Sequence, residues 1–169
     1  MRSPRTALLV VFLVACSSAP PSLSRPHALV LVESSGGSSE TEAFVGRFLS
    51  VLSDAGAGNV ADARLAGAKL VVLRDPSSPE AVRFRSVYPG DGYLGLDLPS
   101  CFFAGRGTGI KCPATVTLLS PGGKELARLE TSASNSTGYS SDSERNPEAE
   151  ASRAAGEKAA KKLLAVLTR

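Results

Sequence analysis

The order of apolar and polar positions predicts strands and helices that follow one another along most of the chain. A short aliphatic run over His27–Glu33 is typical of a buried strand. Apolar residues at helical spacing follow it and predict a helix that ends at Gly56. Ser39 and Glu42 have the spacing of a capping box, so we expect this helix to start at Ser39. Its predicted inward face consists of Phe44, Phe48, Val51, Leu52 and Ala55.

The middle of the chain predicts a short helical turn and three further strands. Ala61–Ala66 is interpreted as the helical turn, and the four apolar residues Leu70–Leu73 as a second buried strand. Ala81–Tyr88 alternates apolar and polar residues, which is typical of a half-exposed strand. Tyr93–Leu98 alternates again, with its leucines on one face.

A hairpin carries the clearest turn signal. Ala114–Leu119 and Glu125–Thr131 flank Ser120–Lys124, in which proline and glycine occupy positions suited to the centre of a turn. The next segment, Ser132–Arg145, contains six serines and is interpreted as a solvated loop.

A final helix is predicted from Asn146 as the N-cap and Pro147 as the first helical residue. Its apolar stripe consists of Ala151, Ala155, Ala159, Leu163, Val166 and Leu167. Together the elements predict an α+β fold, with a small mixed or antiparallel sheet of about four to six strands and two main helices on one side.

The N-terminus has the layout of a secretory signal peptide. Arg2 and Arg5 precede nine apolar residues, Ala7–Ala15. A membrane-spanning helix needs about 20 residues, so this run is too short for a permanent span. A basic region before about 7 to 15 apolar residues is typical of secretion.

The end of that run, Leu13-Val14-Ala15-Cys16, resembles the lipobox of bacterial lipoproteins. The resemblance implies a diacylglyceryl group on Cys16, cleavage just before it, and acylation of the new amino group. Several acyl chains hold a protein firmly on a bilayer, whereas one does so only marginally. Because Ser17 is not aspartate, the resemblance also implies an outer-membrane protein that faces the periplasm. The alternative is a secreted soluble protein.

The expected organisation is therefore a signal peptide over 1–15, a lipidated tether over 16–26 and a single α+β domain over 27–169. The two remaining cysteines, Cys101 and Cys112, make an even number in an oxidising compartment and predict a disulfide. A metal site is the alternative, but two thiols without a nearby histidine fall short of four zinc ligands. We expect no metal and no cofactor.

The net charge does not indicate a nucleic-acid partner. The 169 residues include 19 Lys and Arg against 16 Asp and Glu, and 43% are hydrophobic. Without residues 1–15 the balance is 17 against 16, so most of the basicity belongs to the signal.

Residues with candidate chemistry are few. The glycine-rich stretch 105–111 is not a phosphate-binding loop, because its lysine is followed by Cys112 and not by Ser or Thr. His27 is the only histidine, and no serine elbow accompanies it. Asp91 and Asp97 could form a carboxylate pair or a loose calcium site, but aspartates near glycine turns usually bond their own backbone.

An aromatic cluster leaves two interpretations open. Tyr88, Tyr93, Phe102 and Phe103 lie in a short part of the chain. Alternating strands could bury them in the core, or they could form a patch that binds a partner.

The domain also resembles the amino-terminal domain of TolB, the curli-secretion lipoprotein and the lipoprotein activators of penicillin-binding proteins. The resemblance rests on Ala68–Leu73, on the strand-turn-strand Thr115–Ala127 and on the alanine-rich final helix. It implies a non-enzymatic partner of another envelope protein or of the cell wall. A periplasmic hydrolase with an unrecognised site is the alternative, and self-assembly stays open.

Overall fold

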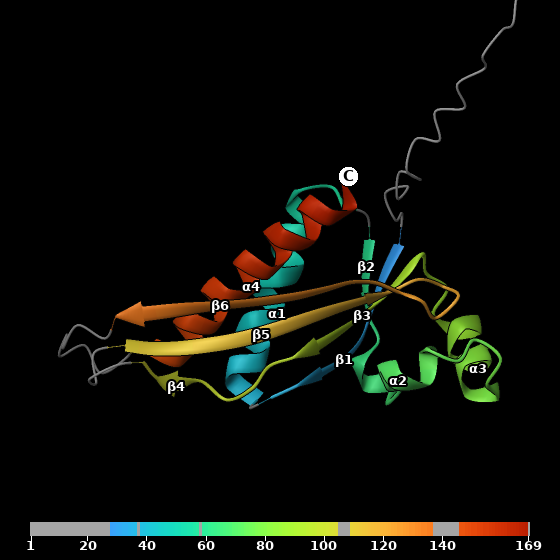
Figure 1. Cartoon of the computed structure of the whole chain (residues 1–169), viewed down its shortest axis with the longest axis horizontal. Coiled ribbons are helices and arrows are strands. Elements are labelled where there is room, and N and C mark those ends of the chain that lie inside the picture. The colour runs from blue at the N-terminus through green and yellow to red at the C-terminus, as the bar shows by residue number, and fades with distance from the viewer. Residues whose placement is uncertain (1–27, 37, 58, 105–108, 137–145, 169) are drawn as a thin grey trace, which may run out of the picture.

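A six-stranded mixed sheet with helices on both faces organises the chain (Figure 1). The computed structural model describes residues 28–36, 38–57, 59–104, 109–136 and 146–168. The α+β class, the strand number and the two main helices on one side are as the sequence predicts. The signal segment and the tether lie outside the described residues.

The parallel part of the sheet is built around β1 (Ala28–Ser35). This strand pairs in parallel with β2 (Asn59–Asp62) on one side and with β3 (Gly92–Asp97) on the other. β1 and β3 are buried on both faces along most of their length, because helices cover both sides of the sheet here.

The antiparallel part is a long hairpin of β5 (Gly109–Leu119) and β6 (Glu125–Ser136). The second half of β5 pairs with β3. The two-residue strand β4 (Phe102–Phe103) pairs with Ile110 and Lys111 on the same edge of β5, since β6 occupies the other edge.

The predicted hairpin is confirmed, and it is longer than its sequence signal. β6 continues to Ser136, so the segment that we interpreted as a loop from Ser132 is strand in its first part. Residues 137–145 of that segment lie outside the described residues. At the turn, Gly123 has a φ of 81° and lies so close to Arg74 that an added Cβ would stand 2.5 Å from its carbonyl oxygen. Only glycine fits there.

Helices α1 (Ser38–Asp54) and α4 (Pro147–Leu167) pack together on one face of the sheet (Figure 1). Asn146 caps α4 as predicted, accepting hydrogen bonds from the backbone N–H groups of Glu148 and Ala149 at 3.1 Å. The predicted capping box of α1 is wrong. Because α1 is already helical at Ser38, Ser39 lies inside its first turn, and Glu42 accepts a hydrogen bond from Arg64 instead.

Three short helical elements cover the other face of the sheet. They are the 3₁₀ turn η1 (Arg64–Ala66), α2 (Leu70–Leu73) and α3 (Pro79–Val87). The strands predicted over Leu70–Leu73 and Ala81–Tyr88 are therefore wrong. A run of four apolar residues does not distinguish a strand from a helical turn. In α3, Ser78 accepts a hydrogen bond from Ala81 N–H at 3.2 Å and proline takes the first helical position, which starts a helix.

α4 also reaches over the edge of the sheet. Lys158 donates a hydrogen bond to the carbonyl oxygen of Ser132 at 3.1 Å, and Lys162 donates one to that of Glu130 at 2.7 Å. The two lysines therefore occupy acceptors of β6, which pairs with one strand only.

Within the described residues, no helix combines the length and the apolar character that crossing a bilayer requires.

Two helical glycines give a matched test of the packing between α1 and α4. A Cβ at Gly156 would stand 2.5 Å from the carbonyl oxygen of Phe44, whereas one at Gly46 meets nothing within 4 Å. We expect Gly156→Ala to lower the free energy of unfolding by about 1–3 kcal/mol, because the helices would have to move apart. Gly46→Ala should raise it by up to about 1 kcal/mol through helix propensity. Urea unfolding of both variants measures the difference, and equal effects would contradict the close approach.

Candidate functional site

The disulfide anchors one end of the molecule. The sulfur atoms of Cys101 and Cys112 are bonded at 2.02 Å, so the structure contains the bridge that the cysteine count predicts. It ties the segment before β4 to β5. The hydroxyl of Ser152 on α4 lies 3.6 Å from the Cys101 sulfur, and a bonded sulfur can only accept, so the hydroxyl is the donor.

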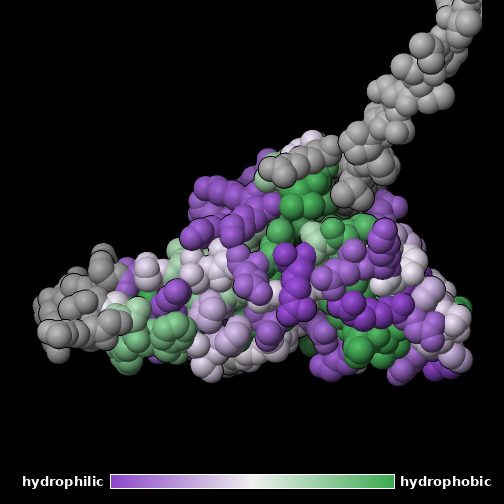
Figure 2. All heavy atoms as spheres, viewed as in Figure 1, coloured by the Kyte–Doolittle hydropathy of each residue, from purple (hydrophilic) through white to green (hydrophobic). Residues whose placement is uncertain are grey.

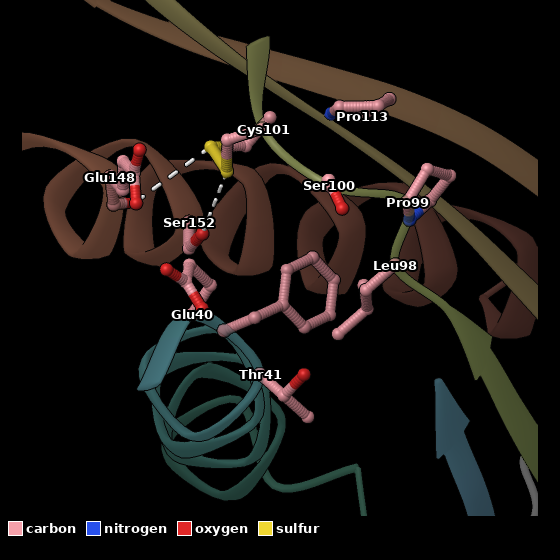
Figure 3. Close-up of a pocket in the computed structure, with 11 residues that line it drawn as sticks. Glu40, Thr41, Leu98, Pro99, Ser100, Cys101, Pro113, Glu148 and Ser152 are labelled. Carbon is pink, nitrogen blue, oxygen red and sulfur yellow. Dashed lines mark hydrogen bonds between the residues drawn. A yellow bond between two sulfur atoms is a disulfide. The ribbon is translucent and has the colours of Figure 1, made fainter. Parts of the chain in front are cut away.

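A hollow of about 290 Å³ opens beside this bridge, between the first turns of α1 and α4 (Figure 3). Figure 3 shows Glu40 on α1 facing Glu148 and Ser152 on α4, with the disulfide next to them. The volume is at the lower end for sites that bind small molecules. Its lining consists of Glu40, Thr41, Phe44, Leu98, Pro99, Ser100, Cys101, Cys112, Pro113, Glu148 and Ser152.

The carboxyl groups of Glu40 and Glu148 face each other across the hollow, and each shifts the pKa of the other. The hydrogen bond with Glu40 raises the pKa of Glu148, and partial desolvation and repulsion by the Glu40 charge add to this shift. A bond from its own backbone N–H, more than the contact with Glu148, lowers the pKa of Glu40. The two groups therefore titrate as a coupled pair.

A buried hydroxyl forms part of the wall. Thr41 is only 7% exposed, and its Oγ1 has no hydrogen-bond partner among the described residues. Gly36 packs against it with a φ of 128°, where an added Cβ would stand 2.6 Å from the carbonyl oxygen of Leu98. The turn before α1 therefore requires glycine, and it holds this wall of the hollow in place.

Chemically, the arrangement can take up and release a proton. In the parts of the chain that the structure describes, no three His, Cys, Asp or Glu side chains gather into a group that could hold a metal ion. Glu40 and Glu148 escaped the sequence analysis, because they meet only when α1 and α4 pack side by side. Their position in the first turn of a helix was the available signal, but it did not indicate that they pair.

The four aromatic residues suggested as a patch do not come together. Tyr93 is 1% exposed and lies in the core under α3, where its hydroxyl donates to the Tyr88 carbonyl at 3.2 Å. Tyr88 is half-buried beside it. Phe102 and Phe103 lie on β4, at the other end of the sheet (Figure 1). For Tyr93, the interpretation as core is the one that the structure supports.

Phe102 and Phe103 are the exposed half of that set, at 49% and 67%. Cys101 precedes them directly, and Phe102 pairs with Lys111, next to Cys112. The disulfide therefore pins the short strand that presents both rings.

Of the remaining candidates, Asp91 and Asp97 hold neighbouring strands together, whereas the other two lie outside the described residues. Asp97 accepts a hydrogen bond from the Ser35 hydroxyl at 2.7 Å, and Asp91 accepts one from Ala28 N–H at 3.0 Å. Both aspartates therefore hold the ends of β1 in place. Cys16 and His27 are not among the described residues.

No protein-family model matches the chain, and no curated protein does. Solved structures do match. PelC from Paraburkholderia phytofirmans, solved as a dodecamer, aligns with a TM-score of 0.55 over 88% of this chain and 91% of that chain, at 11% identity. The chain shares its fold with PelC.

Two further structures are similar. The hypothetical protein CT253 from Chlamydia trachomatis has a TM-score of 0.57 over 83% of this chain and 96% of its own, at 10% identity. Lipoprotein GNA1162 from Neisseria meningitidis has a TM-score of 0.49 over 68% and 87%, at 16% identity. At such identities the likeness concerns the fold alone.

We expect the Glu40–Glu148 pair to give stability a pH dependence of known sign. Because the folded-state pKa of Glu148 is raised, its contribution is fully present below the ordinary value of 4.5 and is lost as the pH rises through the folded-state pKa. The lowered pKa of Glu40 has the opposite effect. Its contribution to stability is present above pH 4.5 and is lost as the pH falls through the folded-state pKa. Glu148→Gln keeps a donor for Glu40, so its stability relative to the parent should increase from about pH 4 to pH 7.

Urea unfolding across this range measures the effect. In a Glu40→Gln background the same change at Glu148 should lose most of its pH dependence, because the partner charge is gone. The same slope in both backgrounds would contradict the pairing.

Proposed function

We propose that this protein is a lipid-anchored, non-enzymatic protein of the cell envelope. In this proposal it faces the periplasm from the outer membrane and binds or positions another envelope protein or a cell-wall component. The observation that carries the proposal is the sequence Leu13-Val14-Ala15-Cys16 at the end of a basic and then apolar leader. The Cys101–Cys112 bridge supports it, because such bonds persist in oxidising compartments.

Phe102 and Phe103 are the proposed contact with the partner. Two adjacent rings that are about half or more exposed are unusual on a free surface, and aromatic side chains often dominate binding energy. The disulfide beside them lowers the cost of ordering on binding, since the strand that presents them is already held.

The facing carboxyl groups of Glu40 and Glu148 favour the alternative, a periplasmic hydrolase, because paired carboxyl groups perform acid–base catalysis in some enzymes. A contact that merely accompanies the packing of the two helix ends would explain the pair equally well. A defect of Glu148→Gln cells with an unchanged partner contact would favour the enzyme.

Acylation of Cys16 is testable in cells of a Gram-negative host. We expect Cys16→Ser to move the protein from the membrane fraction to the soluble periplasmic fraction, because two or more acyl chains are lost. Mass spectrometry of the N-terminal peptide of the parent should show the added lipid. Ser18→Ala, which leaves Leu13–Cys16 intact, is the control and should stay in the membrane. An unlipidated N-terminal peptide in the parent would refute the proposal.

The aromatic contact is testable by crosslinking in intact cells. A photoreactive residue at position 103 should give a discrete adduct with an envelope component, whereas one at the exposed Ser53 on α1 should not. Phe102→Ala should weaken that adduct by about tenfold or more, as truncation of an aromatic hot spot does, without changing the melting temperature. If position 103 crosslinks no more than position 53, β4 is not the contact.

A further inference from the structure

Exposed apolar side chains gather on η1, α2 and α3. Among the described residues, six large apolar side chains are exposed, and four of them belong to these elements: Leu65, Val71, Val82 and Val87, each more than half exposed. Figure 2 shows hydrophobic atoms among hydrophilic ones over this part of the molecule. Isolated exposed apolar residues are ordinary, but a concentration of them indicates a surface that meets something apolar.

The same elements concentrate positive charge. Residues 64–88 contain five basic and two acidic residues, whereas the remainder of residues 16–169 contains 12 basic and 14 acidic ones. Arg83 has no charged partner within the described part of the chain. Lys69 is well exposed and stands 3.6 Å from Glu33, a pair that water screens. Arg64 and Arg74 are neutralised by Asp62 and Glu125, so Lys69 and Arg83 are the cations of this region that can meet an anionic ligand.

A groove of about 450 Å³ runs between α2 and α3. Its walls include the apolar side chains of Val72, Phe84 and Val87. Lys69 and Arg83 also line it, together with one acid, Glu80. An apolar groove with cationic side chains beside it suits an amphiphile with an anionic head, which is the chemistry of an anionic phospholipid.

This groove lies close to the point where the tether enters the domain. Asp91 N–H donates to the Ala28 carbonyl at 2.8 Å, so the chain after α3 is fixed against the first residue of β1. Val87 precedes Asp91 by four residues, so it lies within about 15 Å of that point. Cys16 precedes Ala28 by 12 residues, which reach at most about 43 Å. A lipid on Cys16 therefore keeps this end of the domain near the bilayer.

We propose that Lys69, Val72, Arg83 and Val87, which line this groove, form a membrane-contact face that rests on the anionic phospholipid surface holding Cys16. The inference rests on the proposed lipid anchor. The apolar side chains enter the headgroup layer, and the two cations meet lipid phosphates. Because the tether supplies a high effective concentration of bilayer, a weak surface suffices to orient the domain.

The cysteines of the chain allow a direct test. In the full-length lipidated protein Cys16 is acylated and the other two are bridged, so Val87→Cys introduces the single free thiol for a fluorescent label. The protein is reconstituted into vesicles of phosphatidylethanolamine and phosphatidylglycerol that contain a headgroup-level spin-labelled lipid. We expect the spin label to quench the fluorophore at position 87. Ala154→Cys, exposed on α4 two residues after Ser152 and so near the disulfide end, is the matched control and should be quenched far less.

A second test of the membrane-contact face removes or screens its positive charge. A basic residue close to an anionic surface contributes about fivefold to binding, so Lys69→Gln and Arg83→Gln should each reduce the equilibrium constant for membrane contact by about that factor. Raising the salt from about 0.1 M to 1 M should also weaken the quenching, because the screening length falls from about 10 Å to 3 Å. Arg153→Gln, an exposed charge on α4, should have little effect.

Vesicle flotation separates this proposal from the lipid anchor. Protein that does not float lacks the anchor, which overturns both. Protein that floats while its label at position 87 is quenched no more than the label at position 154 keeps the anchor and overturns the membrane-contact face. Shielding of position 87 only in native envelopes, and not on pure vesicles, would assign the face to a protein partner and would also overturn the proposal.

Discussion

The close approach of α1 and α4 at Gly156 determines much of the geometry around it. With no side chain at this position, the backbone of α4 comes against the carbonyl of Phe44. Directly beside it, Arg47 bonds Glu157 at 2.6 Å, and Lys161 bonds the same carboxylate at 2.6 Å. Lys161 first and then Arg47 lower the pKa of Glu157 to about 2, so this link between the helices stays charged at any ordinary pH. The same approach brings the first turns together, and Glu40 meets Glu148 as a result.

The length of β5 separates the two functional surfaces that we propose. Phe102 pairs with β5 at Lys111, and Tyr93 pairs with it at Leu119, eight residues later. At about 3.3 Å per residue these positions lie about 26 Å apart. The disulfide and the exposed phenylalanines belong to one end, and α3 with the entry of the tether belongs to the other. A protein held at the second end would present the first to the periplasm.

Elements with strong local signals were predictable from the sequence. The Ser120–Lys124 turn fixed the register of the long hairpin, and Asn146 with Pro147 fixed the start of α4. The strands assigned to Leu70–Leu73 and Ala81–Tyr88 were wrong, because short apolar runs carry no decisive period. The Ser78-Pro79 pair was the signal for a helix there. Consequently the resemblance drawn through Ala68–Leu73 as a strand is wrong in that element.

The candidate site was predictable only in part. Counting cysteines found the disulfide, because that inference needs no knowledge of the fold. The Glu40–Glu148 contact joins residues 108 positions apart in the sequence, and no pattern along the chain encodes which helix ends meet. The exposed face of α2 and α3 was missed for a simpler reason, since a segment assigned to strands offers no helical face to inspect.

The hydrogen bonds of Lys158 and Lys162 to β6 have a consequence for solubility. Strands with one unpaired edge are templates on which other chains can add. In this protein α4 covers part of that edge through Lys158 and Lys162, and the same helix also covers the core. If α4 detached from the sheet, it would expose both the apolar core and the unpaired edge of β6. A substitution that weakens the packing of α4 should therefore promote aggregation as well as unfolding.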